Sequence, residues 1–254
     1  MPFRILASLL MLEGVLIARV LSTPPQPKPQ TTEVCNNEYE LDAQFGKATL
    51  AVRQAEEKKA VDCWTKKAKA GEKNLVKAYL IKADLTGAAL GGANLSQSRM
   101  EGANLTKASL LRANLTEAGL TGANLTGARL WGADLTKAIL EETNLTGTDF
   151  KDAKMIEAHL NGATLSGTIF VNTDLTKADF HKQKDGDYTD PTKIVPIDLT
   201  NVRLNMTNFT GANLRGAIFK PYFPPGGSLK GVNLEGARLS GVSLSGMDLT
   251  GHCA

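Results

Sequence analysis

The sequence has few of the residues that build metal centres and catalytic sites. Its 254 residues include three cysteines and three histidines. No two of these lie two to four residues apart, which is the spacing typical of zinc ligands. The histidines His159, His181 and His252 have no matched acid or nucleophile nearby in the sequence. We therefore predict a protein that is not an enzyme, with no catalytic residue, cofactor or metal site.

An excess of charge of either sign is also lacking. The chain carries 29 Lys and Arg against 26 Asp and Glu. A protein that imitates DNA should be strongly acidic, and one that binds DNA should show a basic stripe. The balance therefore argues against a nucleic-acid partner, and nothing indicates a small-molecule substrate. No clean run of about 20 apolar residues is present either, which disfavours a membrane-spanning helix.

What the sequence does have is a period of five. From Leu75 to Phe180 every fifth residue is large and apolar, and the residue two places before it is small, most often Ala. On an α-helix these positions would spiral around the cylinder, and in a flat strand they would alternate between faces. The chain must therefore turn once per unit, so that each Leu and its Ala point toward a common axis. This predicts a solenoid.

The residue before each central position indicates the number of sides. It is Asn or Asp at positions 74, 84, 94, 104, 114, 124, 134 and 144, whereas the interleaved positions hold unrelated residues. An alternation in every second unit fits a four-sided coil made of four units and does not fit a triangular coil made of three. The Asn and Asp side chains would form ladders or bond to the backbone of their own turns.

The units 83–87 (Ala-Asp-Leu-Thr-Gly), 103–107 (Ala-Asn-Leu-Thr-Lys) and 123–127 (Ala-Asn-Leu-Thr-Gly) resemble the pentapeptide-repeat family. The resemblance covers residues 73–251. It implies an all-β solenoid, a right-handed quadrilateral β-helix of about eight coils. Members of this family include DNA-gyrase-protecting DNA mimics and exported or lumenal proteins of photosynthetic organisms. The family pattern contains no catalytic residues.

The N-terminal third lacks the repeat. Residues 1–22 combine Arg4 with apolar stretches and a Val-Leu-Ser end, which predicts a signal peptide or N-terminal anchor, although Glu13 interrupts the apolar run. Residues 23–34 form a Pro-rich linker. The alternatives for the N-terminus are membrane tethering and a disordered or amphipathic segment of a cytoplasmic protein.

Residues 35–72 show helical periodicity and predict a short helical cap on the first coil, whose apolar side chains and strand edges need cover. Phe45, Val52 and Trp64 should face Leu75 and Leu80. In an exported protein, Cys35 and Cys63 would form a disulfide across this cap; three free thiols are the alternative.

Stacked positions lie four units apart, so the outer surface divides into columns. One column contains Leu111, Trp131, Lys151 and Val171, with Arg112, Arg129 and Ile169 beside it. Exposed apolar and aromatic side chains on a polar scaffold indicate a contact site, and we predict partner binding here. The alternative is that Trp131 packs on its arginine neighbours or under a later insertion.

Two breaks interrupt the repeat, near residues 181–196 and 220–228, and both should be loops that leave one corner. Tyr222 and Phe223 in the second break would either contact the partner or cover a coil. The final coil has no predicted helix to cover it, which suggests a homodimer through the C-terminal coil.

The sequence therefore predicts a non-catalytic scaffold that binds a protein partner or has a structural role. We expect it to be exported, to the periplasm, thylakoid lumen or extracellular space. The alternative is a cytosolic inhibitor or protector of a DNA-processing enzyme such as a topoisomerase, which strong acidity would have favoured.

Overall fold

The computed structural model describes Cys35 and residues 50–183, 194–195, 197–199, 202–219, 229 and 231–242. The chain divides into two compact units, Met1–Glu33 and Val34–Ala254, and every described residue belongs to the second. The regular elements within these ranges are the helix α2 (Leu50–Lys69) and the strands β1 (Lys182–Gln183) and β2 (Ile194–Val195). None of the described helical segments has the length and apolarity needed to cross a bilayer.

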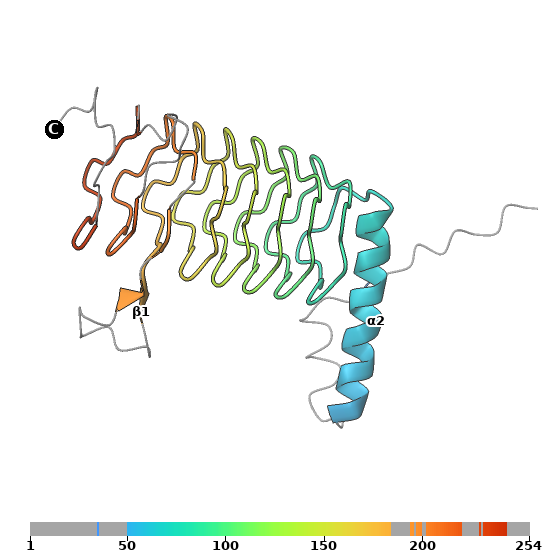
Figure 1. Cartoon of the computed structure of the whole chain (residues 1–254). Helices are drawn as coiled ribbons and strands as arrows, with labels where there is room; N and C mark the ends of the chain where they lie inside the picture. Colours follow the sequence, from blue (N-terminus) through green and yellow to red (C-terminus); the bar gives the residue numbers. More distant parts are fainter. Residues whose placement is uncertain are drawn as a thin grey trace, which may run out of the picture. The chain divides into compact units, whose positions relative to one another are not determined.

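Coils of four units stack in parallel through the body of the described chain. Single-residue parallel bridges join equivalent positions of successive coils, from Asn74 with Asn94 to His159 with Asp179, and four of them fall in each coil. Because the chain turns after every unit, each side of a coil contributes one bridging residue. The four-sided coil expected from the Asn and Asp alternation is thereby confirmed, and Figure 1 shows the coils side by side along one axis.

The corners explain the period of five. The second residue after each central position has a positive φ, as at Gly87 (65°) and Lys107 (57°). This left-handed conformation turns the chain, and glycine adopts it without steric cost. The frequent Gly after Thr therefore marks corners.

The core is built from two columns of each unit. The central Leu, Met or Phe and the Ala two places before it are buried throughout residues 75–180, so the predicted inward positions are confirmed. Phe150 and Phe170 stack at 5.4 Å between ring centroids in neighbouring coils. Each buried Leu contributes roughly 1.5–3 kcal/mol to the free energy of folding before entropy is counted.

Where Thr replaces Ala in the inner column, its hydroxyl is buried but hydrogen-bonded. Thr148 Oγ1 donates to the carbonyl of Leu125 at 2.8 Å, and Thr168 Oγ1 donates to that of Leu145 at 2.9 Å. The acceptor lies in the preceding coil, which satisfies the buried hydroxyl and adds a bond between coils. Thr143, Thr173 and Thr207 make the equivalent bond.

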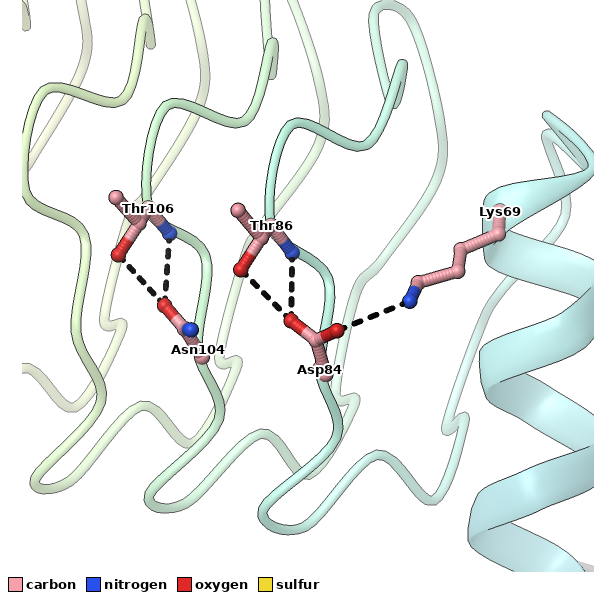
Figure 2. Close-up of polar contacts among 5 residues, drawn as sticks. All are labelled: Lys69, Asp84, Thr86, Asn104 and Thr106. Carbon is pink, nitrogen blue, oxygen red and sulfur yellow. Dashed lines mark hydrogen bonds and ion pairs between the residues drawn. The ribbon is translucent and has the colours of Figure 1, made fainter.

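The outer Asn and Asp residues bond to their own turns. Asn104 Oδ1 accepts from the amide of Thr106 at 3.1 Å and from its hydroxyl at 2.6 Å, and Asp84 does the same with Thr86. Figure 2 shows the two turns in adjacent coils. Of the two roles that the sequence allowed, the structure therefore shows the local turn at these positions.

Helix α2 packs against the first coil. Ala68 is fully buried in the solenoid core cluster, Val61 and Trp64 lie partly buried against it, and Ala60 packs with Tyr79. Trp64 lies partly buried against the core cluster, whereas Phe45 and the side chain of Val52 lie outside the described residues. Cys63 of α2 is disulfide-bonded to Cys35, which is buried.

The register across the first break fixes the length of the insertion. Ile169 bridges Arg203, whereas the regular spacing would pair it with position 189. The shift from position 189 to position 203 equals the length of the span 182–195. The antiparallel pair β1 and β2 begins with Lys182 opposite Val195 and so closes this same span. The insertion is therefore 182–195, slightly shorter than the predicted 181–196, and it leaves and rejoins the coil at one point.

Across the second break Asn208 bridges Asn233, whereas the regular spacing would pair it with position 228. This insertion therefore amounts to one extra unit of five. The loop itself, with Tyr222 and Phe223, lies outside the described residues, as do Cys253 and the final residues of the chain.

Removing residues 182–195 should leave the solenoid intact, because the join of His181 to Pro196 restores the five-residue frame up to Leu199. We expect the free energy of unfolding to change by less than about 1 kcal/mol, since only a surface hairpin is lost. Thermal denaturation followed by circular dichroism tests this. As a control, deletion of residues 110–123 removes the same length but slips the frame and should abolish cooperative unfolding. Aggregation of the first variant would show that the hairpin is part of the fold.

Lys69 of α2 reaches the first coil by pairing with Asp84, at 3.2 Å between Nζ and Oδ2 (Figure 2). The hydroxyl and the amide of Thr86, followed by Lys69, lower the pKa of Asp84 from 3.8 to about 2. Because the folded-state pKa is lowered, the stabilisation by this carboxylate is complete above pH 3.8 and is lost as the pH falls through about 2.

A carboxyl NMR titration should place the midpoint of Asp84 near pH 2. Thr86→Val should raise this midpoint more than Lys69→Met does, because the Thr86 bonds are the larger cause. Asp84→Asn serves as the reference, since Asn104 shows that asparagine supports the same turn. A larger effect of Lys69→Met would instead make the ion pair with α2 the main determinant.

Candidate interaction surface

One outer face of the solenoid carries the side chains that the sequence singled out. We call it the Trp131 face, and its residues are Leu111, Arg112, Arg129, Trp131, Asp149, Lys151, Asp152, Ile169, Val171, Asn172, Arg203 and Met206. The stacking of coils brings them together. The amide of Arg112 donates to the carbonyl of Trp131, and the amide of Gly132 donates to that of Lys151, each at 2.9 Å. Residues far apart in the chain are thereby adjacent on one surface.

Trp131 is held in place by the following coil. Its indole Nε1 donates to Oδ2 of Asp152, and Lys151 Nζ lies 5.2 Å from its ring centroid. Its side chain is nevertheless 51% exposed. A bond at the ring edge and a cation over the ring face restrict rotation, so this Trp is an ordered aromatic platform and not a freely rotating side chain.

Asp152 receives a second bond from the next coil along. Asn172 Nδ2 donates to its Oδ1 at 2.6 Å. The hydrogen bonds from Asn172 and Trp131, with a smaller contribution from the charge of Lys151, lower the pKa of Asp152 below its ordinary value. The carboxylate therefore stays ionised, and continues to hold the indole, at pH values where a free aspartate begins to protonate.

Large exposed apolar side chains are few in the described ranges: Trp131 at 51%, Ile139 at 40%, Val195 at 36% and Met206 at 59%. Two of the four, Trp131 and Met206, are on the Trp131 face. Ile139 bridges Gly119 and His159 on the opposite side of the coil. Leu111 and Val171 are half-buried on the same face as Trp131, so the apolar surface is concentrated there.

The arginines of the Trp131 face have no ion pairs with the described part of the chain. Arg112, Arg129 and Arg203 are exposed, and no carboxylate of the described residues lies within ion-pair distance of them. Asp149 bridges both Arg129 and Ile169, yet its Oδ1 accepts from the amide of Lys151 at 3.0 Å. The face therefore has more cationic than anionic side chains, with Arg112, Arg129, Lys151 and Arg203 against Asp149 and Asp152.

The structure thus brings together Leu111, Arg112, Trp131, Lys151 and Val171, with Arg129 on the adjoining column. Trp131 contacts Lys151 and Asp152 of the following coil. Tyr222 and Phe223 lie outside the described residues.

Five residues of this face were not predicted from the sequence: Asp149, Asp152, Asn172, Arg203 and Met206. The regular spacing of four units could have identified Asp152 and Asn172, since they continue the column of Arg112. Arg203 and Met206 follow the insertion, and their column positions depend on its exact length.

Within the described residues, no group of three His, Cys, Asp or Glu side chains is placed to hold a metal ion.

Comparison with known proteins gives a consistent picture of the repeat. The family model for pentapeptide repeats matches in eight copies, over residues 66–97, 83–122, 93–132, 113–152, 153–182, 197–220 and 226–251. No curated protein matches the chain.

Several solved structures are similar. HetL, a pentapeptide repeat protein involved in heterocyst differentiation regulation from the cyanobacterium Nostoc sp. strain PCC 7120, is 26% identical. The alignment covers 65% of this chain and 84% of that chain, with a TM-score of 0.42. QnrB1, a plasmid-mediated fluoroquinolone resistance protein, is 17% identical over 65% of this chain and 80% of that one, also with a TM-score of 0.42. A pentapeptide repeat protein from the Arabidopsis thaliana thylakoid lumen is 18% identical over 61% and 64% of the two chains, with a TM-score of 0.16.

The ordering of Trp131 by Asp152 can be measured directly. In a Trp64→Phe background Trp131 is the one remaining tryptophan, and its fluorescence anisotropy should drop as the pH falls and the Asp152 carboxylate is neutralised. The midpoint of this drop should lie below the ordinary pKa of aspartate, because the pKa of Asp152 is lowered. Asn172→Ala should move this drop to higher pH, because the Asn172 bond is the largest cause of the lowered pKa. Asp152→Ala should give low anisotropy at every pH, and unchanged anisotropy in that variant would contradict the assignment.

Proposed function

Since the chain belongs to the pentapeptide-repeat family, we propose that it is a non-catalytic scaffold that binds a protein partner through the Trp131 face. The repeat covers most of the chain, and its core and corner positions serve the fold. The freedom to vary lies in the outer columns, so a specific function must be encoded there.

The observation that carries the proposal is Trp131 itself. A half-exposed tryptophan has a large apolar area, and its loss of water on binding is favourable. Because Asp152 and Lys151 already restrict the ring, little conformational entropy remains to be lost when a partner covers it. Residues that dominate binding energies at protein interfaces are enriched in Trp and Arg, and both occur on this face.

We further propose that the fold is right-handed, as in the rest of the family, and that α2 caps the first coil. The buried Ala68, the partly buried Val61 and Trp64, and the Lys69–Asp84 pair support the capping role. Without such a cover the first coil would present unpaired backbone groups and apolar side chains.

Export remains part of the proposal. The apolar N-terminal segment of the sequence and the disulfide between Cys35 and Cys63 support it, because disulfides persist in oxidising compartments. A homodimer through the C-terminal coil is also proposed. The core residues Leu234, Leu239 and Val242 are only partly buried there, whereas their equivalents in residues 75–180 are fully buried.

Site-specific photocrosslinking tests the proposed binding face in cells that produce the full chain. A photoreactive amino acid at Val171 should capture a partner protein, and Trp131→Ala should weaken this capture by about thirtyfold, as expected for a residue worth about 2 kcal/mol in an interface. Folding should be unaffected, because the ring is half-exposed.

The matched control is Ile139→Ala, which removes an exposed apolar side chain from the opposite face and should leave capture unchanged. Equal capture in the Trp131→Ala variant, or equal loss in the Ile139→Ala variant, would show that the Trp131 face is not the binding surface.

A further inference from the structure

The charges around Trp131 indicate what kind of partner segment fits the face. Arg129 and Arg203 occupy the same outer column, joined through the bridges from Arg129 to Asp149, Asp149 to Ile169 and Ile169 to Arg203. Three coil spacings of about 4.8 Å separate them, which is about 14 Å along the solenoid axis. Both are exposed and have no ion pair among the described residues.

Apolar surface lies beside this pair of arginines. Trp131 is on the coil of Arg129, and Met206 is on the coil of Arg203, with Val171 on the coil before it. Met206 is 59% exposed, and its sulfur lies over Gly231 of the following coil. The two arginines thus lie beside a column that contains Trp131 and Val171, with Lys151 between them.

Neither carboxylate of the face lies within ion-pair distance of these arginines. Asp152 accepts hydrogen bonds from Trp131 and Asn172, and Asp149 Oδ1 accepts from the Lys151 amide. Arg112 adds a third guanidinium, one coil before Trp131, that has no ion pair among the described residues. Because guanidinium groups form their strongest pairs with carboxylates, the missing counter-charge is best supplied by the partner.

We infer that the partner contributes an acidic polypeptide segment, lying along the solenoid axis, with two carboxylates about 14 Å apart and an apolar side chain between them. At about 3.3 Å per residue, an extended chain spans this distance in about four residues. Its apolar side chain covers Trp131 and Val171, while its carboxylates pair with Arg129 and Arg203. This inference rests on the proposed partner-binding function.

Fluorescence anisotropy with labelled peptides on the full chain tests it. The probe is acetyl-Gly-Glu-Gly-Phe-Leu-Glu-Gly-amide, and two matched peptides replace both Glu by Lys or replace Phe-Leu by Ser-Gly. The acidic apolar peptide should bind at least about tenfold more tightly than either matched peptide, since tenfold corresponds to about 1.4 kcal/mol. Raising the salt concentration should weaken its binding.

Arg129→Glu and Arg203→Glu should each abolish the preference for the acidic peptide, whereas Arg238→Glu should not. Arg238 is an exposed arginine on the opposite side of the coil, where it bridges Asn213. Equal binding of the basic peptide, or no binding of any peptide, would overturn the inference. If photocrosslinking still depended on Trp131, the proposed partner-binding function would hold, with a partner of different chemistry. If neither the peptide preference nor the Trp131-dependent crosslinking were observed, the proposed function would be wrong as well.

Discussion

The structure depends on one constraint, the backbone pairing of residues that lie four units apart. Each coil donates to and accepts from its neighbours at every side, as when Leu85 donates to Asn104 and Asn104 donates to Ala83. The core alone is thin, because a unit of five buries one large and one small side chain. The amide bonds between coils therefore contribute much of the order, and the left-handed corner residues keep these bonds in register.

This constraint explains how far the sequence could be interpreted. The period of five, the inward columns and the four-unit coil could all be predicted, because every unit has the same structural requirement and therefore the same residue preferences. The positions of the two breaks could be predicted, but the lengths of the insertions could not. Turn residues mark where the regular pattern stops and do not indicate where the pairing between coils resumes. The bridges across the break, such as that from Ile169 to Arg203, give the length of the first insertion.

The candidate site shows the same division. Trp131 stood out in the sequence because an aromatic residue on an outer column has no role in the repeat. Its partners were harder to find, since Asp152 and Asn172 are ordinary polar residues at corner positions. Asp152 and Asn172 both have a positive φ, at 58° and 57°, a conformation that Asn and Asp tolerate better than most residues. Both side chains thus satisfy a backbone requirement, while Asp152 also binds the indole and Asn172 binds Asp152. In the sequence the corner role alone accounts for these residues, so their second role is not apparent.

A scaffold of this kind separates folding from binding more completely than a globular domain does. In most domains a residue that contacts a partner also packs against the core, so a change in one function affects the other. Here the core columns and the outer columns alternate along the chain, and the side chain of Trp131 can change without altering the neighbouring buried Leu130. The outer residues are free to vary in sequence, but an exposed side chain on a repeat has no core packing to orient it. Other contacts must therefore restrict its conformation. Trp131 is oriented by its hydrogen bond to Asp152 and by the cation of Lys151 over its ring. Both residues lie in the next coil, so the stacking of coils that stabilises the fold also orders this surface.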